Sequence, residues 1–96
     1  MDFEGFDWDA GNREKCRKHG VSLREIEALF RGRPHVEPDV THSDMEVRFR
    51  AVGQVNVRWL FVVFTLRDQD GLTLLRPISA RYMHLKEIAF YGKRNA

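Results

Sequence analysis

The segment that most constrains the fold is 57–66, which is apolar on both sides of an extended chain. One side would carry Val57, Trp59, Phe61 and Val63, and the other Leu60, Val62, Phe64 and Leu66. A strand with two apolar sides is buried on both, so we expect it in the middle of a sheet. The run is far shorter than the roughly 20 residues of a membrane-spanning helix. It therefore predicts the core of a soluble protein.

The segments around this strand predict that the sheet is antiparallel. Residues 67–71, Arg-Asp-Gln-Asp-Gly, are typical of a hairpin turn, which makes the segment from Leu72 to about Tyr82 the partner strand. Pro77 cannot donate to a ladder and indicates an edge or a bulge there. From Met45 to Ala51, apolar residues alternate with charged ones, which predicts a strand with one charged side.

Helix-capping residues predict two helices in the first third of the chain. Asp9 is placed to accept backbone N–H bonds at the start of a helix that runs to about Lys18, and Gly20 ends it. Ser22-Leu23-Arg24-Glu25 is a capping box, so the second helix begins at Leu23.

A third helix and two irregular segments complete the expected order. The third helix extends from His84 to about Tyr91, and its apolar face carries Leu85, Ile88 and Ala89. Residues 31–44 contain glycine and prolines among polar residues and predict a loop, whereas the opening segment with Phe3, Phe6 and Trp8 is short enough to be a strand. The order β-α-α-β-β-β-α describes an α+β domain, a small antiparallel sheet with helices packed on it.

Charge and cysteine content narrow the setting in which the protein acts. The 96 residues carry a net charge of +2, but acidic blocks at 1–9 and 34–46 alternate with basic blocks at 13–33 and 48–96. The single cysteine, Cys16, cannot form an internal disulfide, and the acidic start is unlike a signal peptide. We therefore expect a cytoplasmic protein with a locally basic surface.

Common catalytic signatures are missing from the sequence, whereas basic residues are grouped. No phosphate-binding glycine loop, paired-cysteine metal site or glycine-flanked nucleophilic serine is present, and no metal site is expected. Basic side chains crowd the first helix, share the polar side of the strand at 45–51, and follow the strand that ends at Tyr82. Together they would suit a phosphate backbone. The alternative is that they are merely solvated, and that Arg81 forms an ion pair with Glu87 or an N-terminal acid.

Three stretches resemble the BrnT family of bacterial type II toxins. They are Phe6-Asp7-Trp8-Asp9 leading to Lys18-His19-Gly20-Val21-Ser22, then His42-Ser43 with Glu46 and Arg48, and finally Arg76-Pro77-Ile78-Ser79-Ala80-Arg81. In order and spacing they span nearly the whole chain. The resemblance implies a RelE-like fold in a single toxin domain, residues 1–96.

The resemblance also implies an activity and a partner. Such a protein is an endoribonuclease that cleaves RNA without a metal or other cofactor and thereby inhibits translation. It is neutralised by a BrnA-type antitoxin, whose ribbon-helix-helix domain binds operator DNA, and the implied assembly is a 2:2 complex formed through the antitoxin dimer. DNA contact is thus expected only through the antitoxin, and no membrane association is expected.

Site residues follow from the same resemblance. Lys18 and His19 match the Lys-His pair of the family, Glu46 and Arg48 its charged strand, and Arg81 its Ser-Ala-Arg. We expect Arg48 and Arg81 to hold the phosphate, because a guanidinium matches its charge and geometry. His19 is the first candidate for proton transfer, with Glu46 and His84 as reserve base and acid. The residues expected to bind substrate are Arg50, Tyr82, Lys86 and Tyr91.

Other interpretations stay open at this stage. Lys18 and His19 would also stabilise the first helix, because cations interact favourably with the negative, C-terminal end of a helix dipole. Tyr91 would also serve as core packing. The competing function is a non-catalytic partner-binding module with a RelE-like fold. A DNA-binding protein that acts alone is disfavoured, because the sequence contains no recognisable helix-turn-helix or ribbon-helix-helix motif.

Overall fold

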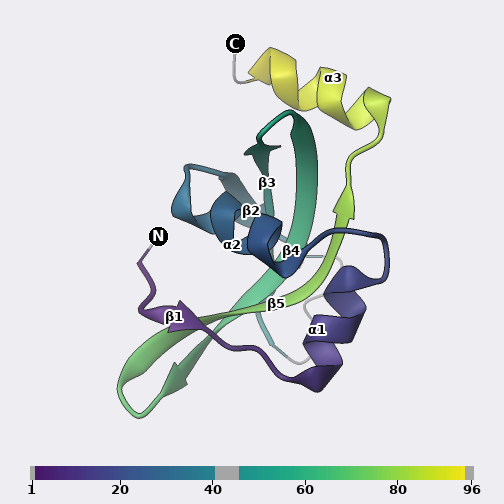
Figure 1. Ribbon diagram of the computed structural model, residues 1–96. Coiled ribbons are helices and arrows are strands. Elements are labelled where there is room, and N and C mark those ends of the chain that lie inside the picture. Colours follow the sequence, from purple (N-terminus) through teal and green to yellow (C-terminus); the bar gives the residue numbers. More distant parts are fainter. Residues whose placement is uncertain (1, 41–45, 95–96) are drawn as a thin grey trace.

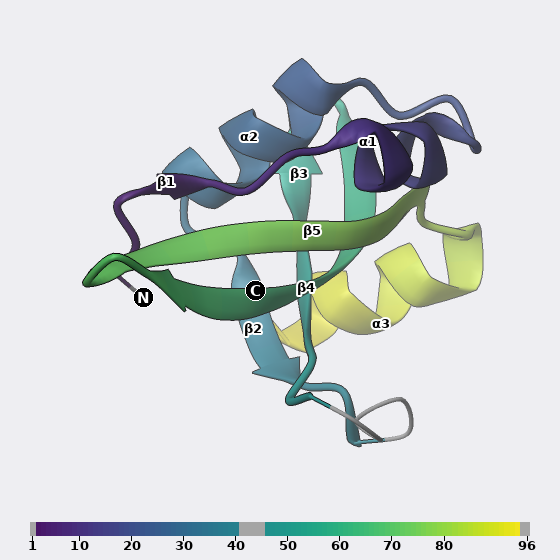
Figure 2. The same ribbon diagram turned by 90° about the horizontal axis from the view of Figure 1, so that it is seen from below.

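A sheet with helices on both faces forms the molecule (Figures 1 and 2). In the computed structural model, which describes residues 2–40 and 46–94, the elements are β1 (Gly5–Phe6), α1 (Ala10–Arg17), α2 (Leu23–Arg31), β2 (His35–Pro38), β3 (Phe49–Val55), β4 (Arg58–Gln69), β5 (Leu72–Tyr82) and α3 (Leu85–Arg94). The α+β class is confirmed. None of these helices is long and apolar enough to cross a membrane.

The strand order is β1-β5-β4-β3-β2, so β4 lies in the middle, as its two apolar sides predict. Two features were not predicted. Residues 35–38, expected within a loop, form the edge strand β2, which pairs antiparallel with β3. β1 pairs with β5 in parallel, so the sheet is mixed. Proline is tolerated on an edge strand, which is why Pro38 does not prevent β2 from forming.

Turn chemistry determines how β4 and β5 pair. Asp70 and Gly71 have φ angles of 52° and 80° and form a two-residue turn, because Gln69 pairs directly with Leu72. Such positive φ values suit Asp-Gly in a hairpin. The predicted disturbance at Pro77 is also observed. The register shifts so that Val63 pairs with Ser79 and Phe64 with Pro77, which leaves Ile78 as the extra residue of a bulge.

The first two helices begin where their caps predict, and they cover one face of the sheet. Asp9 and Ser22 are the N-caps, each within a capping box, and Gly20 has a φ of 89° after α1. Beneath α1 and α2 lies the main core, where the rings of Phe30 and Phe64 meet edge-on with centroids 4.9 Å apart. We call this side of the sheet the covered face.

Helix α3 lies on the opposite side, which we call the open face (Figure 2). The predicted apolar face of α3 is correct for Ile88 and wrong for two residues: Leu85 is 84% exposed and Ala89 is exposed. Ile88 packs together with Tyr91 in a small cluster on the sheet that includes Val52. The predicted residues and the packed residues both have helical spacing, so the periodicity does not show which of them face the sheet. The way in which the chain leaves β5 determines which residues face it.

Candidate functional site

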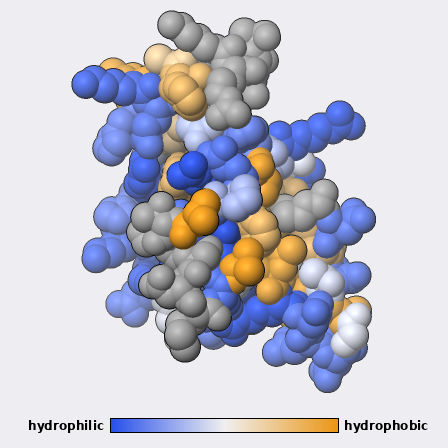
Figure 3. Space-filling model, turned by 180° about the vertical axis from the view of Figure 1, so that it is seen from behind, coloured by the Kyte–Doolittle hydropathy of each residue, from blue (hydrophilic) through white to orange (hydrophobic). Residues whose placement is uncertain are grey.

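The open face of the sheet carries a row of arginine side chains. Cross-strand partners lie on the same face of a sheet, and the register places Arg50 opposite Val63, Arg76 opposite Thr65, and Arg81 opposite Phe61. Arg48 lies two residues before Arg50, and Arg67 two residues after Thr65, so both belong to this face. Figure 3 shows this side of the molecule, with hydrophobic surface near its centre bordered by hydrophilic residues.

A cavity of about 320 Å³ opens at one end of this face. Its lining side chains include Lys15 of α1, Arg48 before β3, Arg67 of β4, and Arg76 of β5. Glu46 is the carboxylate on its wall. Four cations around one hollow attract a polyanion such as a phosphate backbone. Of the predicted site residues, Glu46 and Arg48 are brought together here. The sequence interpretation missed Arg67 and Arg76.

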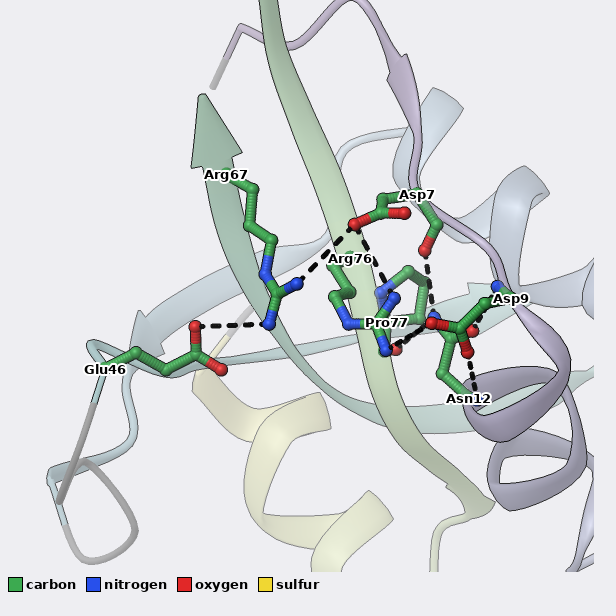
Figure 4. Close-up of polar contacts among 7 residues, drawn as sticks. All are labelled: Asp7, Asp9, Asn12, Glu46, Arg67, Arg76 and Pro77. Atoms are coloured by element: carbon green, nitrogen blue, oxygen red, sulfur yellow. Dashed lines mark hydrogen bonds and ion pairs between the residues drawn. The ribbon is translucent and has the colours of Figure 1, made fainter. Parts of the chain in front are cut away.

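Acidic residues behind the cavity hold two of these arginines in place (Figure 4). Arg76 lies 2.9 Å from an oxygen of Asp9 and 3.5 Å from one of Asp7. Arg67 lies 3.7 Å from Glu46 and 4.0 Å from Asp7. Hydrogen bonds hold the pKa of Asp9 below its ordinary value. The bond from the Asn12 N–H has the largest effect, and the bond from Arg76 the next largest. The sequence interpretation did not place either aspartate in the site, although both belong to the Phe-Asp-Trp-Asp motif, which is the signal that could have indicated them.

Asn12 fixes the wall of the cavity where α1 meets the bulge of β5. Its side chain is 5% exposed, and its Nδ2 donates 2.9 Å bonds to the carbonyls of Asp7 and Pro77. Its Oδ1 accepts from the Asp9 N–H at 2.7 Å. The amide therefore uses both donors and its acceptor, which ties the start of the helix to the strand.

A second polar group lies further along the open face, between β2, β3 and α3. The Glu37 carboxylate accepts from Arg50 Nε at 2.7 Å and from Tyr91 Oη at 3.1 Å. His35 Nε2 lies 3.4 Å from the other oxygen of Glu37. We call His35, Glu37, Arg50 and Tyr91 the Glu37 cluster. Arg50 and Tyr91 were expected to bind substrate, whereas Glu37 and His35 were missed because their strand was read as a loop.

Arg81 forms the third polar group, at the junction of β5 and α3. Its guanidinium makes a two-pronged ion pair with Glu87, at 2.7 and 2.9 Å, and lies 4.4 Å from the centroid of the Phe61 ring. Hydrogen bonds from Arg81, and to a smaller extent from the His84 N–H, lower the pKa of Glu87 to about 2. The ion pair that the sequence left open as an alternative is therefore present. His84 and Lys86 are exposed beside it.

The remaining predicted residues lie around the end of α1. Lys18 and His19 are exposed there, and Tyr82 Oη donates to Glu25 at 2.9 Å and lies 3.5 Å from the Gly20 carbonyl oxygen. Tyr82 thus points to the covered face, opposite its neighbour Arg81. Lys18 lines a hollow that shares Lys15 with the cavity. His42 and Ser43 of the second motif, like Met45 of the predicted strand, lie outside the described residues.

Comparison with protein families gives a match. A family profile described as "Ribonuclease toxin, BrnT, of type II toxin-antitoxin system" matches residues 8–87. No curated protein matches the chain. The matched segment contains every residue that lines the cavity, and it confirms the family resemblance drawn from the sequence motifs.

Proposed function

Because the chain belongs to the BrnT family of ribonuclease toxins from type II toxin-antitoxin systems, we propose that it is an endoribonuclease that cleaves RNA without a metal ion. Cleavage of RNA in the cytoplasm would inhibit translation. The proposed toxin domain comprises residues 1–96. The observation that carries this proposal is the cavity lined by Lys15, Arg48, Arg67 and Arg76.

The cavity suits an RNA phosphate on electrostatic grounds. A guanidinium donates two parallel N–H bonds to phosphate oxygens, and preorganised cations are most effective where charge develops during the reaction. Asp7 and Asp9 hold Arg76 and so preorganise it, at 17% side-chain exposure. Arg48 keeps the phosphate-binding role that we expect from the sequence. The roles of Lys18, His19, Arg81 and His84 remain predictions.

Cleavage of a labelled RNA by the purified protein in excess EDTA tests this proposal. We expect Arg48→Gln, at a half-buried position, to lower the cleavage rate at least about tenfold while leaving the melting temperature within about 2 °C, because interactions of partly exposed charges contribute little to stability. Arg24→Gln, which removes an exposed arginine from α2, is the matched control and should cleave normally. Intact RNA in the presence of folded wild-type protein would overturn the proposal and favour a non-catalytic binding module.

We further propose that the antitoxin is a BrnA-type ribbon-helix-helix protein that forms a 2:2 complex with this chain and provides its contact with operator DNA. The support is the toxin-antitoxin system named in the family description. A small ribbon-helix-helix gene adjoining this one, and co-purification of the two products at the mass of a 2:2 complex, would be the expected results. A product without a ribbon-helix-helix domain would contradict the antitoxin type.

A further inference from the structure

The Glu37 cluster brings a carboxylate, an imidazole, a guanidinium and a phenol together on the open face, outside the cavity described above. Three groups that carry protons, from His35, Arg50 and Tyr91, meet at the Glu37 carboxylate, and the four residues come from β2, β3 and α3. Side-chain exposure is 23% for Glu37, 29% for His35 and 38% for Arg50, whereas Tyr91 is 8% exposed overall. The carboxylate and imidazole are thus partly shielded but still open to a ligand.

We propose that Glu37 and His35 transfer the protons in RNA cleavage, with Arg50 contacting the reacting phosphate and Tyr91 acting as a positioning residue for Glu37. This inference rests on the proposed ribonuclease function and locates its chemical step. It assigns proton transfer to residues that the sequence motifs did not indicate.

The contacts of Glu37 favour its ionised form, which is the form that can accept a proton. Burial alone would raise its pKa, but hydrogen bonds from Tyr91 and Arg50 outweigh burial and place the pKa below its ordinary value. The carboxylate is therefore ionised at neutral pH, as a general base must be. Its second oxygen faces His35 at 3.4 Å, and an imidazole is the side chain best suited to give or take a proton near neutral pH.

The reaction balances without any further reactant. Glu37 takes the proton of the ribose 2′-hydroxyl, and the 2′-oxygen forms a bond to the phosphorus while the bond from phosphorus to the 5′-oxygen breaks. Protonated His35 supplies the proton to the departing 5′-oxygen. The products are a 2′,3′-cyclic phosphate and a 5′-hydroxyl end. Arg50 is placed to stabilise the extra negative charge on the phosphate oxygens during the step.

The cluster lies between two hollows that would hold the RNA on either side of the cut. Arg50 follows Arg48 by two residues on the same side of the chain, which is about 7 Å along a strand, so the basic cavity is its neighbour. On the other side, His35 lines a second hollow of about 480 Å³ with Trp59 and Arg33. Nucleobases stack on exposed aromatic rings, so Trp59 provides a surface for a base next to His35.

The pH dependence of cleavage distinguishes proton transfer from a structural ion pair. We expect a bell-shaped rate profile, because Glu37 must be ionised and His35 protonated. Glu37→Gln should lower the single-turnover rate by about 10²- to 10⁴-fold and abolish the acidic limb, and His35→Asn should abolish the basic limb. Arg50 and Tyr91 face the pair, and neither is altered. RNA affinity should change less than about threefold.

The outcomes separate this inference from the proposed function. If Arg48→Gln impairs cleavage while Glu37→Gln and His35→Asn cleave at the wild-type rate with unchanged pH limbs, the inference is wrong and the ribonuclease function stands. If Glu37→Gln does not fold, His35→Asn decides, because the His35 side chain is 29% exposed and its contacts with Glu37, at 3.4 Å, and with the Tyr91 ring, at 5.7 Å between centroids, contribute little to stability. A product with a 5′-phosphate instead of a cyclic phosphate also overturns the inference. Wild-type protein that leaves RNA intact removes both proposals.

Discussion

The two faces of the sheet differ in how they are covered: the main apolar core lies on one face, and the other combines a small apolar cluster with a row of arginines. On the covered face, Leu60, Val62 and Phe64 of β4 are fully buried under α1 and α2. On the open face, arginines are each about a sixth to a half exposed and face carboxylates. Burial of apolar surface stabilises a fold far more than partly exposed ion pairs do. The covered face therefore maintains the structure, and the open face is available for a substrate.

The sharpest test of this contrast is to remove a large side chain from the covered face. Phe64→Ala should lower the free energy of unfolding by about 3–5 kcal/mol, because the ring is fully buried between Phe30 and Phe49 and leaves a cavity. Urea denaturation measures the change. Leu85→Ala, at a position that is 84% exposed, is the control, with an expected change below about 0.5 kcal/mol. Equal effects at both positions would refute the contrast.

Asn12 belongs to α1, which packs on the covered face, and it also lines the cavity on the open face. Asn12→Ala should cost about 2–3 kcal/mol, because the Pro77 carbonyl loses its amide partner at a buried position. Thermal unfolding gives the change, and Gln54→Ala at an exposed position of β3 is the control. Cleavage should fall as well, since Asn12 lines the cavity. A destabilised variant with unchanged cleavage would separate the two roles.

The smallest expected effect on stability concerns the open-face ion pair between Arg81 and Glu87. A carboxylate with a folded-state pKa of about 2 instead of 4.5 stabilises the protein above pH 4.5, and this contribution is lost as the pH falls toward 2. Glu87→Gln should therefore lower stability by about 1 kcal/mol at pH 7, given its partial exposure, and flatten the acid dependence. Denaturant midpoints from pH 7 to pH 2.5 show the slope. Glu14→Gln, at an exposed site on α1, controls for the loss of one carboxylate.

Local chemistry explains which parts of the fold were predictable. The caps at Asp9 and Ser22, the turn at Gly71 and the bulge at Pro77 depend on residues close together in the chain, and each is observed. The strand β2 was missed because glycine and prolines flank a short segment whose stability comes from pairing with β3. Pairing of that kind leaves little trace in a four-residue stretch.

The site was predictable to a lesser degree for the same physical reason. The motifs indicated Arg48 and Glu46, and the cavity brings them together. In the Glu37 cluster, Glu37 bonds to Tyr91, which is 54 positions further along the chain, and the sequence contained no local pattern for this cluster. Charge alternation also did not reveal which arginines face an acid.

The amino-acid sequence was sufficient for the α+β class, the central strand, the helix starts and the family, because each depends on local patterns of polarity or on short motifs. Tertiary structure decided which side of α3 packs, that Arg81 is joined to Glu87, and that His35, Glu37, Arg50 and Tyr91 meet. Those outcomes depend on the register of β2 on β3 and on where α3 docks. Both result from the packing of the whole chain, so no single segment specifies them.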